Sequence, residues 1–120
     1  MPTRRAENDR VALLQGTLDL LILRTLVLGP RHGQDIARTI QRDSEEVFIV
    51  DHGSLYLALQ RLEEKRWVSA KWGVSANNRK ARFYTLTPKG QAQLANKTNQ
   101  WRRLARAIGL ILGPAGQEAQ

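Results

Sequence analysis

Apolar residues recur at the three- and four-residue spacing of a helix in four stretches of the chain. Residues 17 to about 28 are apolar on nearly every side, which predicts a helix at the centre of the fold. Residues 33 to about 42 and 53 to about 65 predict two shorter helices with one apolar face each. A longer helix is expected to run from Pro88 to about Leu112.

The expected helix ends carry residues with capping chemistry. Thr17 is predicted to cap the first helix, with Asp19 in its first turn, where the helix dipole favours negative charge. Gly29 and Pro30 are expected to end that helix. Thr87 is predicted to cap the last helix, with Pro88 as its first residue, and Gly113 and Pro114 to end it.

Two runs with the composition of β-strands lie between the third and the last helix. Residues 67–74 and 80–86 flank a segment of turn-forming residues, 75–79, so they are expected to form a hairpin. In the connection from Asp43 to Asp51, residues 47–50 are candidates for one more short strand.

Three helices followed by a hairpin are the element order of a winged helix-turn-helix. The predicted fold class is α+β, mainly α, with a long C-terminal dimerisation helix. We expect a flexible basic arm at residues 1–13, which carries Arg4, Arg5 and Arg10, and a winged-helix DNA-binding domain at residues 14–87. Residues 88–112 would form the dimerisation helix and residues 113–120 a tail.

Charge narrows the class of partner. The chain has 120 residues, the size of one domain, and its 19 Lys and Arg against 11 Asp and Glu give a net charge of +8. No acidic residue lies between Lys65 and Glu118. A surface that served only solubility would mix both signs, so a polyanion such as double-stranded DNA is the expected partner.

The chain has no cysteine, which excludes disulfides, zinc fingers and thiol catalysis. No signal-peptide pattern is present, and the longest apolar run, residues 18–28, is too short to cross a bilayer. We therefore expect a soluble, cytoplasmic protein with no membrane partner.

The third helix has a face suited to reading bases. With Leu55, Ala58, Leu59 and Leu62 turned inward, the opposite side carries an apolar group, an amide and a guanidinium in Leu57, Gln60 and Arg61. These are the groups that contact base edges and thymine methyls. Ser54 and Tyr56 offer hydroxyls for phosphates. The alternative is an ordinary amphipathic helix with a solvated face.

The turn of the hairpin concentrates positive charge and amides. The residues expected to contact phosphates are Asn77, Asn78, Arg79, Lys80 and Arg82. A solvated turn is the alternative, because asparagine is common in turns in any case.

The last helix has more apolar surface than one small core can bury, which favours self-association into a homodimer. The expected dimerisation residues are Leu94, Trp101, Leu104, Ala105, Ile108, Ile111 and Leu112. Trp101 is the only aromatic among them and is suited to stack on a small aromatic or apolar effector between the paired helices. The alternatives are a purely intramolecular helix and a tryptophan that only packs.

Five motifs, in order, resemble those of the PadR family of transcriptional regulators. They are Leu18-Asp19-Leu20-Leu21-Ile22-Leu23, His32-Gly33, Gly53-Ser54-Leu55-Tyr56, Leu59-Gln60-Arg61-Leu62-Glu63 and Phe83-Tyr84-Thr85-Leu86-Thr87-Pro88-Lys89-Gly90. The run from Trp72 to Tyr84 is similar to a subgroup common in acidobacterial genomes. Gln34, Leu57 and Arg66 stand where the family usually has Tyr, Pro and Gly.

The resemblance implies a winged helix with a C-terminal dimerisation helix. It also implies transcriptional repression that is released when a small ligand binds or conditions change. It covers residues 14 to about 112 and assigns no effector-binding residue.

Catalysis is not expected. The two histidines, His32 and His52, have no metal-ligand spacing to a carboxylate, and His32 reads as a local hydrogen-bonding residue. No phosphate loop or nucleophile motif is present, and no cofactor or metal is predicted.

A basic winged helix that binds RNA, or that acts as a protein-interaction module, remains the alternative. Single-stranded RNA is read by exposed aromatics on a sheet. Trp67, Trp72, Phe83 and Tyr84 lie on or beside the hairpin, and most are expected to pack under it. An exposed Trp72 with an open ring face would favour RNA.

Overall fold

The computed structural model describes residues 15–114. The predicted arm and nearly all of the predicted tail lie outside the described residues, including Arg4, Arg5 and Arg10. In chain order the elements are α2 (Gln15–Thr25), β1 (Arg31–His32), α3 (Gly33–Asp43), α4 (His52–Glu64), β2 (Val68–Val74), β3 (Lys80–Leu86) and α5 (Pro88–Leu112). The four helices and the small sheet of the described residues confirm the mainly α winged-helix fold.

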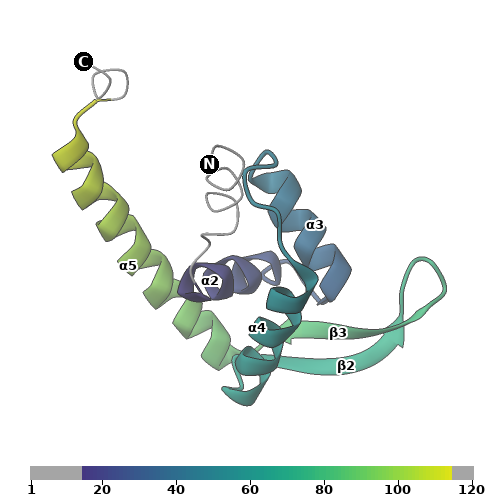
Figure 1. Ribbon diagram of the computed structural model, residues 1–120. Helices are drawn as coiled ribbons and strands as arrows, with labels where there is room; N and C mark the ends of the chain where they lie inside the picture. The colour runs from purple at the N-terminus through teal and green to yellow at the C-terminus, as the bar shows by residue number, and fades with distance from the viewer. Residues whose placement is uncertain (1–14, 115–120) are drawn as a thin grey trace.

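The sheet is a hairpin with a short third strand at its base. Its order is β1-β3-β2, with both pairs antiparallel. Figure 1 shows the far end of the hairpin projecting away from the helices, while α5 leaves the body on the other side. The strand β1 was not predicted, because two residues are too few for any periodicity. It forms where Arg31 lies opposite Tyr84 and His32 opposite Phe83.

The core lies where α2, α3, α4 and the base of the sheet meet. The four residues predicted to face inward on the third helix are all buried, with Leu55, Leu59 and Leu62 completely so. The other buried apolar side chains are Leu18, Ile22, Leu23, Leu26, Ile36, Ile40, Val50, Trp67, Val68, Tyr84 and Leu94. The predicted central position of α2 is confirmed, since α2 packs against α3, α4 and α5.

The bounds and the cap of α2 differ from the prediction. The helix includes Gln15, so Thr17 lies inside it rather than at its cap, and Asp19 is past the first turn. Regular helix ends at Thr25 instead of Leu28. There the Thr25 hydroxyl donates to the Ile22 carbonyl at 2.7 Å, and the next backbone N–H groups bond three residues back.

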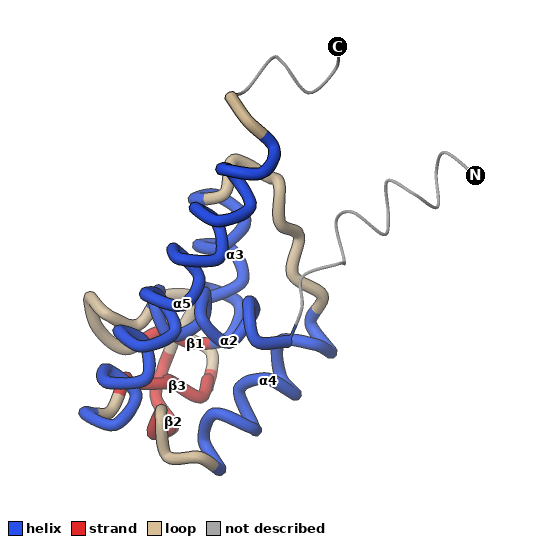
Figure 2. The backbone as a smooth tube through the Cα atoms, turned by 90° about the vertical axis from the view of Figure 1, so that its left-hand side faces the viewer, coloured by secondary structure: helices blue, strands red, loops and turns tan. Residues whose placement is uncertain are grey.

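The prediction of a strand at residues 47–50 is wrong. This segment belongs to the long connection between α3 and α4, drawn as an extended loop in Figure 2. Val47 and Ile49 are exposed with no strand beside them, while Val50 is buried and Phe48 half-buried. Alternate side chains therefore fix the loop to the core without any sheet partner.

Both ends of α5 are as predicted. The Thr87 hydroxyl accepts a hydrogen bond from the Gly90 N–H at 3.0 Å, and Pro88 is the first helical residue. Gly113 ends the helix at a positive φ of 82°. A side chain at Gly90 would collide with the Trp67 carbonyl, so this glycine lets α5 start directly against the base of β2.

Candidate nucleic-acid interface

The helix α4 starts at a side-chain cap. The Asp51 carboxylate accepts hydrogen bonds from the Ser54 N–H at 2.9 Å and from the Ser54 hydroxyl at 3.2 Å. The bond from the Ser54 N–H, helped by the hydroxyl, lowers the pKa of Asp51 below its ordinary value. Ser54 is exposed as expected, but its hydroxyl proton is already directed to Asp51.

The exposed face of α4 carries four of the five α4 residues expected to contact DNA, Ser54, Tyr56, Leu57 and Gln60. Leu57 is 61% and Tyr56 47% exposed, and Gln60 is exposed as well. The Tyr56 ring stacks on His52 one turn earlier, with ring centroids 6.5 Å apart. It also lies against Gly33, where an added Cβ would come 2.7 Å from the Tyr56 hydroxyl oxygen. The start of α3 therefore packs closely beside this face.

Arg61 is placed differently from its neighbours on α4. Its Nη2 donates to Oδ1 of Asp19 on α2 at 3.1 Å, and the side chains of Arg61 and Asp19 are 30% and 5% exposed. Its Nε is buried without a hydrogen-bond partner in the described part of the chain. The guanidinium is thus engaged inside the protein rather than presented beside Gln60.

The hairpin turn is held by its own backbone. The Ser75 N–H donates to the Arg79 carbonyl at 2.8 Å, and the Asn78 N–H to the Ser75 carbonyl at 2.9 Å. Asn78 takes a left-handed conformation, with φ 60°, which asparagine tolerates better than most residues. Asn77, Asn78, Arg79 and Lys80 are all exposed at this end of the hairpin.

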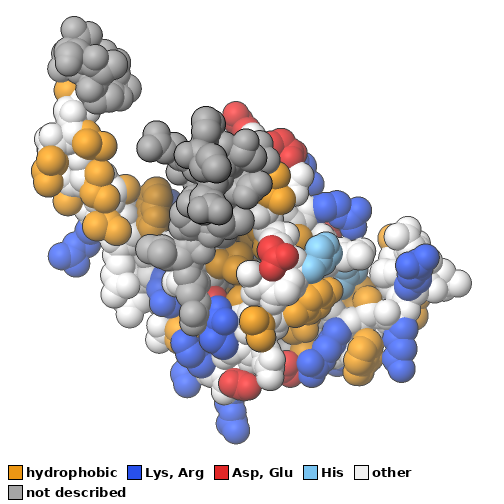
Figure 3. All heavy atoms as spheres, in the orientation of Figure 1, with side chains coloured by type: hydrophobic (Ala, Val, Ile, Leu, Met, Phe, Trp, Pro, Cys, Tyr) orange, Lys and Arg blue, Asp and Glu red, His pale blue; other side chains and the backbone are white. Residues whose placement is uncertain are grey.

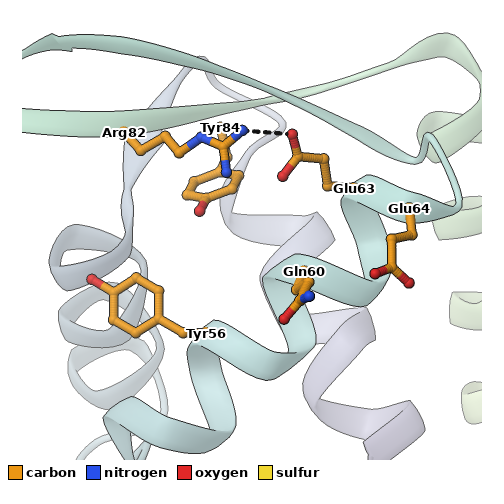
Figure 4. A pocket seen from close by; sticks show the side chains of 6 residues that line it. All are labelled: Tyr56, Gln60, Glu63, Glu64, Arg82 and Tyr84. Carbon is orange, nitrogen blue, oxygen red and sulfur yellow. Dashed lines mark hydrogen bonds and ion pairs between the residues drawn. The ribbon is translucent and has the colours of Figure 1, made fainter.

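Two neighbouring cavities of about 580 and 540 Å³ border the hairpin. The first lies between the hairpin and α4, and the second also reaches the start of α3 at Gly33 and Gln34. Figure 4 shows Tyr56 and Gln60 of α4 on one side of the first and Arg82 and Tyr84 of β3 on the other. Arg82 donates to Glu63 at 2.8 Å, which ties the hairpin to α4. Burial raises the pKa of Tyr84 above its ordinary value.

Together these residues form a surface with cations along the hairpin and polar and apolar groups on α4. Figure 3 shows Lys and Arg side chains alternating with hydrophobic ones along the projecting hairpin. Such a surface suits a double-stranded nucleic acid. Its phosphate backbone would contact the hairpin, and its base edges would contact α4.

Trp72 is the exposed aromatic residue of the hairpin. The expectation that most aromatics there are packed is confirmed for Trp67 and Tyr84, at 9% and 5% exposure. Trp72, however, is 61% exposed, with the Lys80 ammonium 5.2 Å from its ring centroid. Strand alternation places Trp72 on the same face as buried Val68, but farther along β2, where this face borders a cavity instead of the core.

The predicted dimerisation residues divide into two groups. Leu94 is buried in the core of the single chain, so its surface is not available to a second copy. Ala105 is half-buried. Exposed hydrophobic side chains gather along the outer half of α5 in Figure 3; they include Trp101, Leu104, Ile108, Ile111 and Leu112.

The described residues also bear on metal binding, on membrane spans and on the role of His32. Within residues 15–114 no group of His, Asp and Glu side chains is arranged to hold a metal ion. None of the helices described is both long and apolar enough to cross a membrane. His32 caps α3 by accepting the Asp35 N–H on Nδ1 at 3.3 Å, which confirms its local hydrogen-bonding role.

Comparison with known proteins identifies relatives over most of the chain. The profile of the family described as "Transcriptional regulator PadR-like family" matches residues 22–96. A protein of Lysinibacillus sphaericus named "Uncharacterized protein X" is 29% identical over 103 residues, which cover 86% of this chain and 94% of that one.

Solved structures show the same fold. A PadR family transcription regulator from Clostridium difficile R20291 is similar, with a TM-score of 0.70 and 28% identity over 80% of this chain and 98% of that one. A transcriptional regulator from Clostridium thermocellum has a TM-score of 0.76 at 24% identity, over 85% of this chain and 99% of the other.

Proposed function

Because the chain belongs to the PadR-like family of transcriptional regulators, we propose that it is a sequence-specific DNA-binding repressor that acts as a homodimer. As such a regulator it would act without catalysis, in the compartment that holds the DNA. The observation that carries the proposal is the exposed face of α4 lying beside the projecting basic hairpin, with two cavities that border the hairpin.

In this proposal α4 lies in the major groove and the hairpin follows the backbone. Leu57 and Gln60 contact base edges. Phosphate contacts come from Tyr56, Asn77, Asn78, Arg79, Lys80 and Arg82. Ser54 is not among them, because its hydroxyl and its N–H both donate to Asp51. Arg82 contributes less than Arg79, because its charge is already paired with Glu63. Arg61 does not read a base; its ion pair with Asp19 holds α4 against α2.

The test separates phosphate contacts from base contacts. A preferred duplex is first selected from a random-sequence library, and this duplex and a scrambled one are then titrated at several salt concentrations. Arg79→Ala should weaken both duplexes alike and lower the salt slope by about one unit. Gln60→Ala should cost about 1–3 kcal/mol on the selected duplex only.

Lys71→Ala is the matched control, because Lys71 is an exposed cation on the other face of the same hairpin. It should leave both titrations nearly unchanged. A protein that selects no duplex would refute the proposal. If Arg79→Ala alone relaxed specificity, the hairpin would read bases or groove width, and the assigned roles would be reversed.

The outer half of α5 supports the homodimer. We call the exposed apolar residues Trp101, Leu104, Ile108, Ile111 and Leu112 the stripe. The stripe borders a shallow hollow of about 340 Å³, lined by Trp101, Leu104, Ala105, Ile108, Gly109 and Leu112. Apolar surface of this extent on a helix beyond the core is typical of an interface.

For release from DNA we propose a flat aromatic or apolar effector that stacks on Trp101 between the paired helices. Trp101 is half-exposed and borders two adjoining hollows along α5, one of them shared with Leu20 of α2. Planar compounds should quench the protein's fluorescence, and Trp101→Phe should remove that response while Trp72→Phe keeps it. No Trp101-dependent quenching across a broad panel would count against this site.

A second candidate function, RNA binding, is favoured by one observation, the exposure of Trp72. Trp72 is a single exposed indole with Lys80 near its ring, whereas sheets that read single-stranded RNA stack two or three bases on several aromatics. A mobility-shift assay of duplex DNA against single-stranded RNA at matched salt separates the two. Tighter binding of the RNA would replace the DNA proposal.

A further inference from the structure

The inner face of the hairpin changes character along its length. The register pairs Val68 with Leu86, Ala70 with Tyr84, Trp72 with Arg82 and Val74 with Lys80, and paired residues share a face. At the base this face is core, with Val68 and Tyr84 buried. Beyond the helices the same face is open. We call its open part, made of Trp72, Val74, Lys80 and Arg82, the wing face.

The wing face combines large apolar groups with cations. Trp72 and Val74 are 61% and 66% exposed. The Lys80 ammonium lies 5.2 Å from the Trp72 ring centroid, and Arg82 is next to Trp72 across the strands. A hairpin surface exposed only to solvent, or one that binds its partner through charge alone, is not expected to expose side chains as apolar as Trp72 and Val74.

The orientation of the wing face ties it to α4. Arg82 belongs to it and bonds to Glu63 of α4, so the face is turned to the side on which α4 presents Tyr56 and Gln60. The cavity of about 540 Å³ is lined by Trp72, Lys80 and Arg82 together with Tyr56. A duplex against α4 would therefore also reach Trp72.

We propose that Trp72 packs against a deoxyribose of duplex DNA while Lys80 contacts the neighbouring phosphate. This inference rests on the proposed DNA binding and adds a contact that the charged residues alone do not supply. The sugar-phosphate backbone alternates apolar carbon surface with negative charge, which matches the alternation of indole and ammonium on the wing face. Like other backbone contacts, it positions the protein without reading sequence.

An unpaired base is the other partner that stacks on an indole. Surfaces that bind single strands place several aromatics in succession and contact one base on each. The wing face offers one indole, with Lys80 near its ring. The duplex backbone therefore fits this face better.

The experiment uses the full chain with the selected duplex, the scrambled duplex and one single strand of the selected sequence. Trp72→Ala should weaken both by a similar factor, on the order of tenfold for the loss of one large apolar contact. Trp72→Leu should retain most of the affinity, because a sugar accepts any apolar neighbour. Lys80→Ala should lower the salt slope by about one unit, and Lys71→Ala, from the opposite face, should not.

Fluorescence gives a second readout that does not depend on substituting Trp72 by a small residue. Duplex should change the emission of the wild type and of Trp101→Phe, and the change should be lost in Trp72→Phe. Unchanged Trp72 emission on saturation with duplex would overturn the proposal even if Trp72→Ala failed to fold.

The remaining outcomes decide between the Trp72 contact, an unpaired base as partner, and no DNA binding at all. If Trp72→Ala binds both duplexes like the wild type, the contact is refuted while DNA binding stands. If Trp72→Ala loses binding only to single strands, and Trp72→Leu loses it equally, the partner is an unpaired base. A wild type that binds no duplex refutes both this contact and the proposed function.

Discussion

At the scale of single residues, two helix ends use left-handed backbone without glycine. Arg66 follows α4 with φ 64°, its N–H bonded to the Glu63 carbonyl and the Trp67 N–H bonded to the Leu62 carbonyl. Glu45, with φ 53°, ends α3 by the same pair of bonds. This is a helix end that favours glycine at the left-handed position. Arg66 also stands where the resemblance implies a glycine, so the departure has a conformational cost.

Replacing Arg66 by glycine should therefore stabilise the fold. The left-handed conformation costs a residue with a side chain roughly 1–2 kcal/mol, partly offset by the freedom that glycine adds to the unfolded chain. We expect Arg66→Gly to raise the free energy of unfolding by up to about 1 kcal/mol in urea titrations. Glu64→Gly, two residues earlier and inside α4, should lower it by a similar amount. Equal losses in both variants would contradict this account.

Asp51 should make the start of α4 sensitive to acid. Its pKa is lowered in the folded chain because Ser54 donates to the carboxylate, so between the folded and unfolded pKa values the unfolded chain binds more protons. The stabilisation is complete above the ordinary pKa of an aspartate and is lost as pH falls through the lowered value.

Asp51→Asn keeps an oxygen for the cap but removes the titration. In denaturant titrations at several pH values, the advantage of the wild type over Asp51→Asn should be constant near neutral pH. It should shrink below about pH 4, the ordinary range of an aspartate pKa. An advantage that grows in acid would show that the carboxylate is not the stabilising group.

At the scale of elements, α4 is fixed at two points of its length. Arg61 binds Asp19 on α2, and Glu63 binds Arg82 on β3. The first pair joins a nearly buried carboxylate to a partly buried guanidinium. Breaking such a pair leaves an uncompensated charge inside the fold. These two bonds set how α4 sits between the core and the hairpin.

Arg61→Ala should therefore act on stability before it acts on specificity. We expect the free energy of unfolding to fall by about 2–3 kcal/mol, since Asp19 loses its partner. Gln60→Ala, its exposed neighbour, should change stability by less than about 0.5 kcal/mol. If Arg61→Ala kept full stability and lost discrimination between duplexes, Arg61 would read a base, as the sequence had indicated.

At the scale of the whole molecule, the chain is elongated, with extents of 53 × 34 × 21 Å. The helix α5 packs on the core through Leu94 in its first half and then continues beyond the body with exposed apolar residues, while the hairpin projects on the other side (Figure 1). A second copy that covers this stripe would join two DNA-binding surfaces through their α5 helices, as binding to a two-fold symmetric site requires.

Placing charge on the stripe should separate the copies. Trp101→Asp combined with Ile108→Asp should give monomers in sedimentation analysis, because two carboxylates would be buried against an apolar partner. The matched control is Asn99→Asp combined with Arg106→Asp, which helical spacing puts on the other side of α5. The control should remain dimeric. If the first variant also stays dimeric, the interface lies elsewhere.

Local patterns in the sequence were enough to predict the helices, the hairpin and much of the core. Leu55, Ala58, Leu59 and Leu62 are buried because a helix with that spacing has only one apolar face to bury. The Thr87 cap was predictable because its bond to Gly90 joins residues three apart. At the interface, Leu57, Gln60 and the charges of the hairpin end are exposed as their positions suggested.

Only the tertiary structure decided which partner each group meets. Arg61 looks like a base reader in the sequence, and its bond to Asp19 joins residues 42 apart. Leu94 continues the apolar stripe of α5, yet it lies in the chain's own core, and Trp72 shares a face with buried Val68, yet it is open. Periodicity determines which side of an element is apolar, because that depends on backbone geometry. How far along an element the neighbouring elements cover that side depends on packing between distant segments, which no local pattern contains.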